Sequence, residues 1–161
     1  MAFPSLSIGD LTAKMPIVQG GMGVGISLSG LASAVANQGG IGVIAGAMIG
    51  MKEPDVAKNP IEANLRALRQ ELTKAREKTQ GIIGVNIMVA LTTFSQMVRT
   101  AIENRADIIF SGAGLPLEMP KHLLQACEEK KEEFKTKLVP IVSSARAATL
   151  IARKWLSRFD Y

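Results

Sequence analysis

Short apolar runs rich in isoleucine and valine recur along the chain and are separated by segments with helical periodicity. The runs cover Ile17 to Gln19, Ile41 to Ala45, Ile83 to Val89, Ile108 to Phe110 and Leu138 to Val142. Because they are almost continuously apolar, they are typical of parallel strands that are covered on both faces. Their alternation with helical segments predicts an α/β fold of five βα units.

Capping residues mark the helices expected between these strands. Ser27 is expected to cap a helix over Leu28 to Gln38, and Asn59 one that starts at Pro60, with Glu62 as capping-box partner, and runs to about Lys78. Three more helices are expected, from a cap at Thr93 to Asn104, from Pro120 to about Lys135, and from a cap at Ser144 to Ser157. Periodicity alone leaves an open doubly wound sheet and part of a barrel equally possible.

Charge adds little to this picture. The formal charge is +5, but acids and bases are interspersed on the expected helix surfaces, as in EANLRALRQELTKAREK. This pattern indicates solvated helix faces, so no nucleic-acid partner is expected. The exception is a locally unbalanced basic cluster formed by Arg146, Arg153, Lys154 and Arg158.

The sequence also bears on where the protein resides. Cys127 is the single cysteine and cannot form an internal disulfide, and residues 1–16 lack the basic and apolar regions of a secretory signal. The longest apolar stretch, Ile41 to Met51, is about half the ~20 residues that a membrane-spanning helix needs. We therefore expect a cytoplasmic protein without a membrane segment.

Glycine is concentrated at the front of the chain, where the run Gln19 to Gly25 directly follows the first expected strand. Such a run exposes backbone N–H donors and lets a planar or anionic ligand approach the main chain. A dinucleotide fingerprint does not fit, because Ile26 or Leu28 occupies the third glycine position and the second strand has no acid at its end. A phosphate-binding P-loop is excluded because no Gly-Lys-Ser/Thr is present.

Further polar or glycine-rich residues follow the other expected strands. Asn86 interrupts the apolar run Gly84 to Met88, and a buried carboxamide without a partner would cost roughly 1 to 3 kcal/mol. Ser111 to Pro116 and Ser143-Ser144 follow the fourth and fifth strands. All of these stretches lie at the carboxyl ends of strands, where barrels and open α/β sheets both place ligands.

Four motifs in order resemble the nitronate monooxygenase family, formerly called 2-nitropropane dioxygenases, and its relatives the flavin-dependent enoyl-ACP reductases. They are PIVQGGMG from Pro16, LASAVANQGGIG from Leu31, GVNIM from Gly84 and SGAGLP from Ser111. The resemblance implies a (β/α)8 TIM barrel, of which residues 1–161 would be the N-terminal half with the first five βα units. It also implies FMN as cofactor, and alkyl nitronates and O2 as substrates of the parent enzyme.

Carried over onto this sequence, the resemblance implies that Gly20, Gly21, Met22 and Gly23 lie along the flavin ring and that Asn86 hydrogen-bonds it. Ser111 and Gly112 are expected beside the ring or the substrate. The family's catalytic histidine follows a strand that would come after Tyr161, and its phosphate-binding loops come later still, so the fragment alone is expected to be inactive. His122 and Cys127 are interpreted as ordinary helix residues, and no metal site is expected.

Two alternatives stay open at this point: an enoyl-ACP reductase, and a non-catalytic open-sheet module that assembles as an oligomer. Because five βα units of a barrel would leave two sheet edges unpaired, self-association through those edges is also expected.

Overall fold

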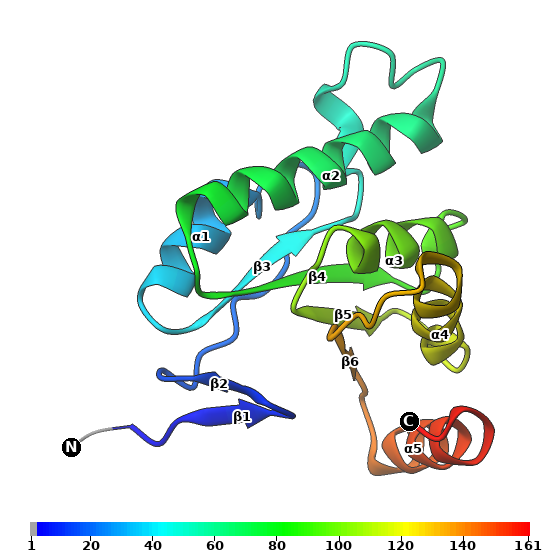
Figure 1. Ribbon diagram of the computed structural model, residues 1–161. Helices are drawn as coiled ribbons and strands as arrows, with labels where there is room; N and C mark the ends of the chain where they lie inside the picture. Colours follow the sequence, from blue (N-terminus) through cyan, green and yellow to red (C-terminus); the bar gives the residue numbers. More distant parts are fainter. Residues whose placement is uncertain (1–2) are drawn as a thin grey trace.

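The computed structural model describes residues 3–161, which form four parallel strands, an antiparallel hairpin and five α-helices (Figure 1). The strands are β1 (Leu6–Ile8), β2 (Leu11–Ala13), β3 (Ile41–Ala45), β4 (Ile82–Met88), β5 (Ile108–Gly112) and β6 (Lys137–Pro140). The helices are α1 (Ser29–Asn37), the short 3-10 helix η1 (Ile49–Lys52), α2 (Pro60–Lys78), α3 (Phe94–Glu103), α4 (Met119–Lys130) and α5 (Ala145–Phe159).

The sheet has the order β3-β4-β5-β6, with every neighbouring pair parallel. This confirms the α/β class and four of the five expected strands. The expected strand at Ile17 to Gln19 is wrong as a full strand, because only one parallel bridge, from Val18 to Ile41, forms there. The side chain of Gln19 replaces the next backbone pair: its amide bonds the carbonyl and the N–H of Val43 at 3.0 and 3.2 Å.

Side-chain alternation along the strands divides the core into two layers. Ile83, Val85 and Ile87 of β4 are fully buried against the helices, together with Trp155 of α5 and the apolar faces of α1 to α4. In Figure 1 helices α1 to α4 lie on one side of the sheet, whereas α5 lies apart from them beyond β6. This helix-covered face is the larger part of the core.

The opposite face of the sheet is covered near the amino ends of its strands by the hairpin β1–β2, which the sequence reasoning did not anticipate. Leu6, Ile8 and Leu11 of the hairpin pack against a second cluster that contains Val43 and Phe110. The tip of the hairpin is fixed by an ion pair of 2.6 Å between Asp10 and Lys137. The hairpin does not cover the carboxyl ends of the strands on this face, where the loops lie instead.

The helix-capping predictions had mixed outcomes. Ser144 caps α5 as expected, accepting the N–H of Ala147 at 3.2 Å. The predicted side-chain caps at Ser27, Asn59 and Thr93 are wrong, because none of these residues makes a cap hydrogen bond. The predicted end of the fourth helix at Lys135 is also wrong, since α4 ends at Lys130 before a left-handed residue.

The helix α1 is capped instead by a residue from another helix. The carboxylate of Glu71 in α2 accepts the N–H of Ser29, the first residue of α1, at 2.9 Å. Lys74 pairs with the same carboxylate at 2.8 Å. A free N–H at a helix start needs an acceptor, and here tertiary packing supplies one that no local sequence signal shows.

The outward N–H groups of both edge strands are occupied by the chain itself. On β3, Ile41, Val43 and Ala45 donate to Ile17, to the Gln19 side chain and to Ser27. On β6, Leu138 donates to the hydroxyl of Tyr161 at 2.9 Å, and Pro140 has no N–H. Self-association through these edges stays a prediction, and it would have to displace these groups.

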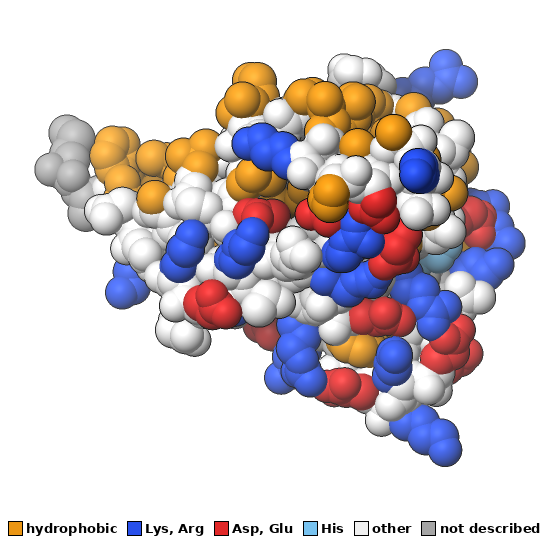
Figure 2. All heavy atoms as spheres, turned by 90° about the horizontal axis from the view of Figure 1, so that it is seen from above, with side chains coloured by type: hydrophobic (Ala, Val, Ile, Leu, Met, Phe, Trp, Pro, Cys, Tyr) orange, Lys and Arg blue, Asp and Glu red, His pale blue; other side chains and the backbone are white. Residues whose placement is uncertain are grey.

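Charged side chains on the helix surfaces are mixed in sign. Along α2, Arg69, Lys74 and Arg76 pair with Glu62, Glu71 and Asp107. Seen from above in Figure 2, basic and acidic side chains are interspersed over much of the molecule, and hydrophobic side chains gather along one margin. No helix within residues 3–161 has the length and apolar character needed to cross a bilayer.

Candidate functional site

The loops at the carboxyl ends of the strands form one continuous row. The glycine run contacts the start of the β3–η1 loop, where Val24 donates to the carbonyl of Ala47 at 3.0 Å. Gly46 donates to the carbonyl of Asn86 at 2.8 Å, and Val89 donates to that of Gly112 at 2.8 Å. Three stretches that the sequence singled out separately are thus joined, together with the β3–η1 loop, along one edge of the sheet.

The glycine loop, residues 20–27, is held in shape by Ser27. Its hydroxyl accepts the N–H of Met22 at 3.0 Å and donates to the carbonyl of Gly20 at 3.3 Å. The N–H of Ser27 donates back to the carbonyl of Met22 at 2.9 Å. Ser27 is 1% exposed, so it lies buried beneath the glycine loop. We expected this residue to cap a helix, but it fixes the conformation of the loop instead.

The hydrogen bonds of the glycine loop leave a regular set of donors free. The N–H groups of Met22, Val24 and Ile26 are bonded within the chain. In the part of the chain that the structure describes, those of Gly20, Gly21, Gly23 and Gly25 have no acceptor. These are backbone donors without titrating side chains, of the kind that can stabilise negative charge on a bound group.

Asn86 lies directly beside this loop. A Cβ atom placed on Gly21 would be 2.6 Å from the Cβ of Asn86, so only glycine fits against it. Within residues 3–161 the Asn86 carboxamide has no hydrogen-bond partner, yet no fully buried side-chain polar atom lacks one. The amide therefore reaches the surface of the site with its donor and acceptor free.

Three of the six non-glycine residues with a left-handed backbone in the described chain lie in the same row of loops, and the other three lie just after helices. Val24, Met48 and Ala113 adopt left-handed conformations, with φ of 56°, 53° and 54°. For a β-branched residue such as Val24 this conformation is rare, and strain of this kind costs of order 1–3 kcal/mol at each position. The loops are over-determined by their contacts, which is the usual condition of a ligand-binding edge.

The structure places Ser111 and Gly112 differently from one another. Ser111 is fully buried on the helix-facing side of β5, and its hydroxyl donates to the carbonyl of Ile87 at 2.9 Å. Gly112 is on the other face, where an added Cβ would lie 3.0 Å from that of Ile141. A role of Ser111 beside a ligand would have to use its backbone, whereas Gly112 lies within the row of loops.

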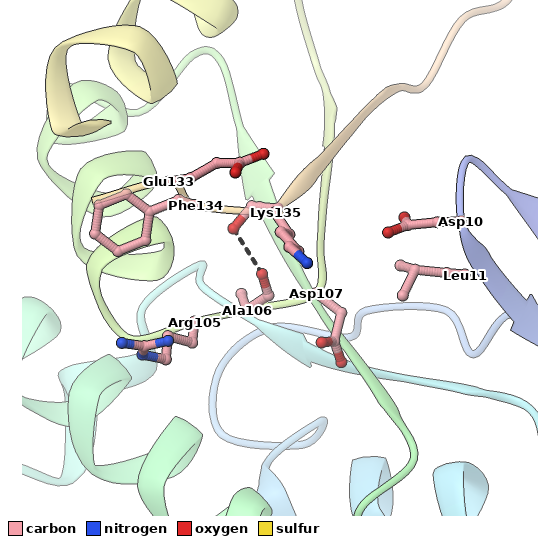
Figure 3. Close-up of a pocket in the computed structure, with 9 residues that line it drawn as sticks. Asp10, Leu11, Arg105, Ala106, Asp107, Glu133, Phe134 and Lys135 are labelled. Atoms are coloured by element: carbon pink, nitrogen blue, oxygen red, sulfur yellow. Dashed lines mark hydrogen bonds between the residues drawn. The ribbon is translucent and has the colours of Figure 1, made fainter. Parts of the chain in front are cut away.

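Two hollows lie at opposite ends of the sheet. One of about 450 Å³ is at the carboxyl ends of β5 and β6, and its lining includes Gly114, Leu115, Ile141 and Ser143. Another of about 400 Å³ is at the amino ends, lined by residues from the hairpin and from the segments before β5 and β6 (Figure 3). Parallel α/β proteins bind ligands at the carboxyl ends, so we assign the candidate site to the first of these ends.

Two polar side chains that line the amino-end hollow, Asp107 and Thr136, have structural roles. Asp107 bonds Arg76 and the N–H of Ile83 at 2.6 and 2.7 Å, and Thr136 donates to the carbonyl of Ala106 at 2.8 Å. These hydrogen bonds connect the amino ends of β4, β5 and β6.

Titratable side chains are scarce at the carboxyl-end site. The single histidine, His122, is on α4, where its ring meets Phe94 edge-on with 6.3 Å between centroids. Burial, with the nearby charge of Lys121, lowers its pKa below the ordinary value. Among the described residues no group of three or more His, Cys, Asp or Glu side chains is arranged to hold a metal.

Solved structures of two other proteins have a fold similar to that of this chain. FabK from Thermotoga maritima is 28% identical, with a TM-score of 0.63 over 86% of this chain and 37% of the FabK chain. Nitroalkane oxidase from Streptomyces ansochromogenes is 18% identical, with a TM-score of 0.62 over 87% of this chain and 44% of that one. The chain thus spans less than half the length of these structures. A comparison with curated proteins gives no match.

The parallel βα units and these structural neighbours define a segment of a TIM-barrel fold. The family model for nitronate monooxygenase matches residues 5–159. The chain belongs to the nitronate monooxygenase family, as the sequence motifs predicted.

Proposed function

We propose that this chain is the part of an FMN-dependent nitronate-oxidising enzyme that holds the flavin ring. The proposal rests on two features that lie side by side. The Asn86 amide has no hydrogen-bond partner in the described chain, and the glycine loop next to it has N–H groups without an acceptor there. Membership of the nitronate monooxygenase family supports a flavin as the occupant.

Each group of residues in the site would bind a different part of the flavin or the substrate. Gly20, Gly21, Met22 and Gly23 would lie along the ring, with the free glycine N–H groups directed at its negative charge. Asn86 would bond the polar edge of the ring, because a carboxamide offers a donor and an acceptor together. Gly112 would border the space for the substrate, an alkyl nitronate. When bound, FMN would supply the electron-accepting chemistry and the site of O2 reduction.

The chain itself contributes binding and orientation rather than proton transfer. The amide and the backbone donors do not titrate near neutral pH. The single histidine, His122 of α4, packs against Phe94 of α3. The base that would take the proton alpha to a nitro group is therefore expected outside this row of loops. We expect the 161-residue chain to bind FMN and to show no nitronate oxidation.

A flavin-dependent enoyl-ACP reductase is the second candidate, because the GVNIM and SGAGLP stretches fit both families and FabK is a structural neighbour. The non-catalytic module is the third. It would fold and assemble without taking up flavin.

The binding claim is tested by titrating FMN with the purified chain and following flavin fluorescence. Asn86→Ala should weaken binding by about tenfold, which corresponds to ~1.4 kcal/mol. The matched control is Gln125→Ala, at an exposed position on α4, which should bind as the parent chain does. Absence of binding by the parent chain, or equal binding by the Asn86 variant, would overturn the proposal.

The substrate class is tested on the chain loaded with FMN. An alkyl nitronate should perturb the absorbance of the bound flavin, and an enoyl thioester should not. The opposite result would favour the reductase, and oxygen uptake with a nitronate would contradict the expected inactivity of the chain.

A further inference from the structure

Ser27 uses all of its polar atoms to hold the glycine loop against the sheet. Its hydroxyl accepts the N–H of Met22 at 3.0 Å and donates to the carbonyl of Gly20 at 3.3 Å. Its N–H donates to the carbonyl of Met22 at 2.9 Å, and its carbonyl accepts the N–H of Ala45 in β3 at 2.9 Å. Because Ser27 is 1% exposed, one buried residue anchors the loop to β3.

Three of these bonds also set the direction of the neighbouring peptide groups. A peptide unit is planar and trans, so its C=O and its N–H point in opposite directions. The carbonyl of Gly20 shares a peptide with the N–H of Gly21, and the carbonyl of Met22 shares one with the N–H of Gly23. Because Ser27 bonds both carbonyls, both N–H groups point away from it. The carbonyl of Gly21 also points away, since the N–H of Met22 points at the Ser27 hydroxyl.

The side of the loop opposite Ser27 is therefore the side that carries the unused backbone groups. Within residues 3–161 the N–H groups of Gly21 and Gly23 have no acceptor, and the carbonyl of Gly21 has no donor. On this side the loop presents two donors with one acceptor between them. Ser27 determines this arrangement without being part of it.

The two glycines are also confined by their neighbours, which limits how far these peptide groups can turn. An added Cβ would lie 2.6 Å from the Asn86 Cβ at Gly21, and 3.0 Å from the Ala47 carbonyl oxygen at Gly23. A hydrogen bond to a carbonyl polarises its peptide unit, and this strengthens the N–H donor of the same unit. Ser27 thus both directs and strengthens the two free donors.

We propose that Ser27 is a positioning residue for the flavin, which directs the N–H groups of Gly21 and Gly23 at the negative charge that the ring gains on reduction. This inference rests on the proposed function, in which the glycine loop lies along the ring. Donors that are fixed before the charge develops stabilise it without reorganisation. Loss of the Ser27 hydroxyl should weaken the binding of reduced FMN more than that of oxidised FMN, and this lowers the reduction potential of the bound flavin.

The test compares Ser27→Ala with Ser33→Ala in the chain loaded with FMN. Ser33 of α1 is 2% exposed, and its hydroxyl donates to the carbonyl of Ala75 at 3.4 Å, away from the loop. Equilibration of the bound flavin with a redox dye measures its potential. Ser27→Ala should weaken reduced FMN about tenfold more than oxidised FMN, which for a two-electron couple is a shift of about 30 mV to more negative potential. Ser33→Ala should keep this ratio within twofold of the parent chain. Equal weakening of the two redox forms by Ser27→Ala would overturn the inference.

A second measurement separates the two donors. Ser27→Ala keeps the backbone N–H at position 27, so the bond to the Met22 carbonyl stays and only the hydroxyl bonds are lost. In the ¹⁵N-labelled chain, FMN should shift the amide resonances of Gly21 and Gly23, and Ser27→Ala should reduce the Gly21 shift at least twofold and retain the Gly23 shift. Ser27→Thr, which keeps the hydroxyl, should restore the Gly21 shift. Loss of both shifts together in Ser27→Ala would contradict the role of the hydroxyl in directing Gly21.

Failure of this inference is distinguishable from failure of the proposed function. If the parent chain takes up no FMN, the proposed function is wrong and the inference fails with it. If the parent chain binds FMN and Ser27→Ala keeps both the parent potential and the parent Gly21 shift, only the role of Ser27 is refuted.

Discussion

Gly21 and Asn86 are in contact so close that an added methyl group on Gly21 would come within 2.6 Å of the Asn86 Cβ. Gly21 belongs to the glycine loop and Asn86 to strand β4, and the two residues are 65 positions apart in the sequence. Their contact fixes the distance between the glycine loop and the free carboxamide. The glycine at position 21 is therefore required by a neighbour as well as by any ligand.

Gly21→Ala should lower the free energy of unfolding by about 1–3 kcal/mol, because the new methyl group has to displace the backbone or Asn86. Chemical denaturation of the flavin-free chain measures this effect. Gly20→Ala is the control, since nothing lies within 4 Å of a Cβ at Gly20, and it should change stability by less than about 0.5 kcal/mol. Equal effects of the two substitutions would refute the contact argument.

Val24→Gly should stabilise the chain by up to about 1 kcal/mol. The left-handed conformation of Val24 stores about 1–3 kcal/mol, and relief of this strain exceeds the extra entropy that glycine loses on folding. Thermal unfolding with and without the substitution measures the difference. Val24→Ala, which keeps a Cβ, should change stability less, and a destabilised glycine variant would show that Val24 is not strained.

Tyr161→Phe should destabilise the chain by about 1 kcal/mol. The substitution removes the acceptor of the Leu138 N–H and leaves the edge-on contact with Trp155, whose centroid is 5.6 Å away. Denaturant unfolding gives the energy, and sedimentation shows whether the freed edge of β6 now pairs between molecules. An unaltered unfolding midpoint and a monomer at high concentration would argue against this cap.

Glu71→Gln should remove a part of the stability that depends on pH. Burial raises the pKa of Glu71, but hydrogen bonds from Lys74 and from Ser29 outweigh burial and leave the pKa below its ordinary value. A lowered carboxyl pKa in the folded state stabilises above the unfolded pKa, near 4.3, and this contribution disappears as pH falls through the folded pKa. The variant should be about 1 kcal/mol less stable at pH 7 and should converge with the parent chain in acid.

The comparison for this pH effect is Glu62→Gln. Glu62 pairs with Arg69 on the exposed side of α2, where its side chain is 55% exposed, so its loss should change stability by less than about 0.5 kcal/mol. If the free energy of unfolding depends on pH in the same way for both glutamine variants, the hydrogen bond from Ser29 to Glu71 makes no pH-dependent contribution to stability.

Four of the five expected strands form, and they could be predicted because their residues are buried on both sides and read as continuous apolar runs. Ile83, Val85 and Ile87 face the helices, while residues between them face the hairpin or the loops. The hairpin itself was missed, since β1 and β2 have only three residues each and carry no strong pattern. The first expected strand was overestimated, because half of its pairing is made by the side chain of Gln19.

Positions of the candidate site residues were predictable from strand ends, but their hydrogen bonds were not. Ser27 reads locally as a helix cap, and only its burial beneath the glycine loop shows that it bonds Met22 and Gly20 instead. Ser111 follows an apolar strand as a ligand residue would, yet alternation turns its hydroxyl toward the helices. Such outcomes depend on tertiary packing, which a linear motif does not encode.

The alternating hydrogen bonds of the glycine loop give it an unexpected dynamic signature. Amide protons of Met22, Val24 and Ser27 are engaged, whereas those of Gly20 and Gly23 are not. In deuterated water, fast and slow exchange should therefore interleave along a segment whose composition suggests uniform looseness. A ligand that occupies the free donors would slow only the fast set, so exchange rates can report occupancy amide by amide.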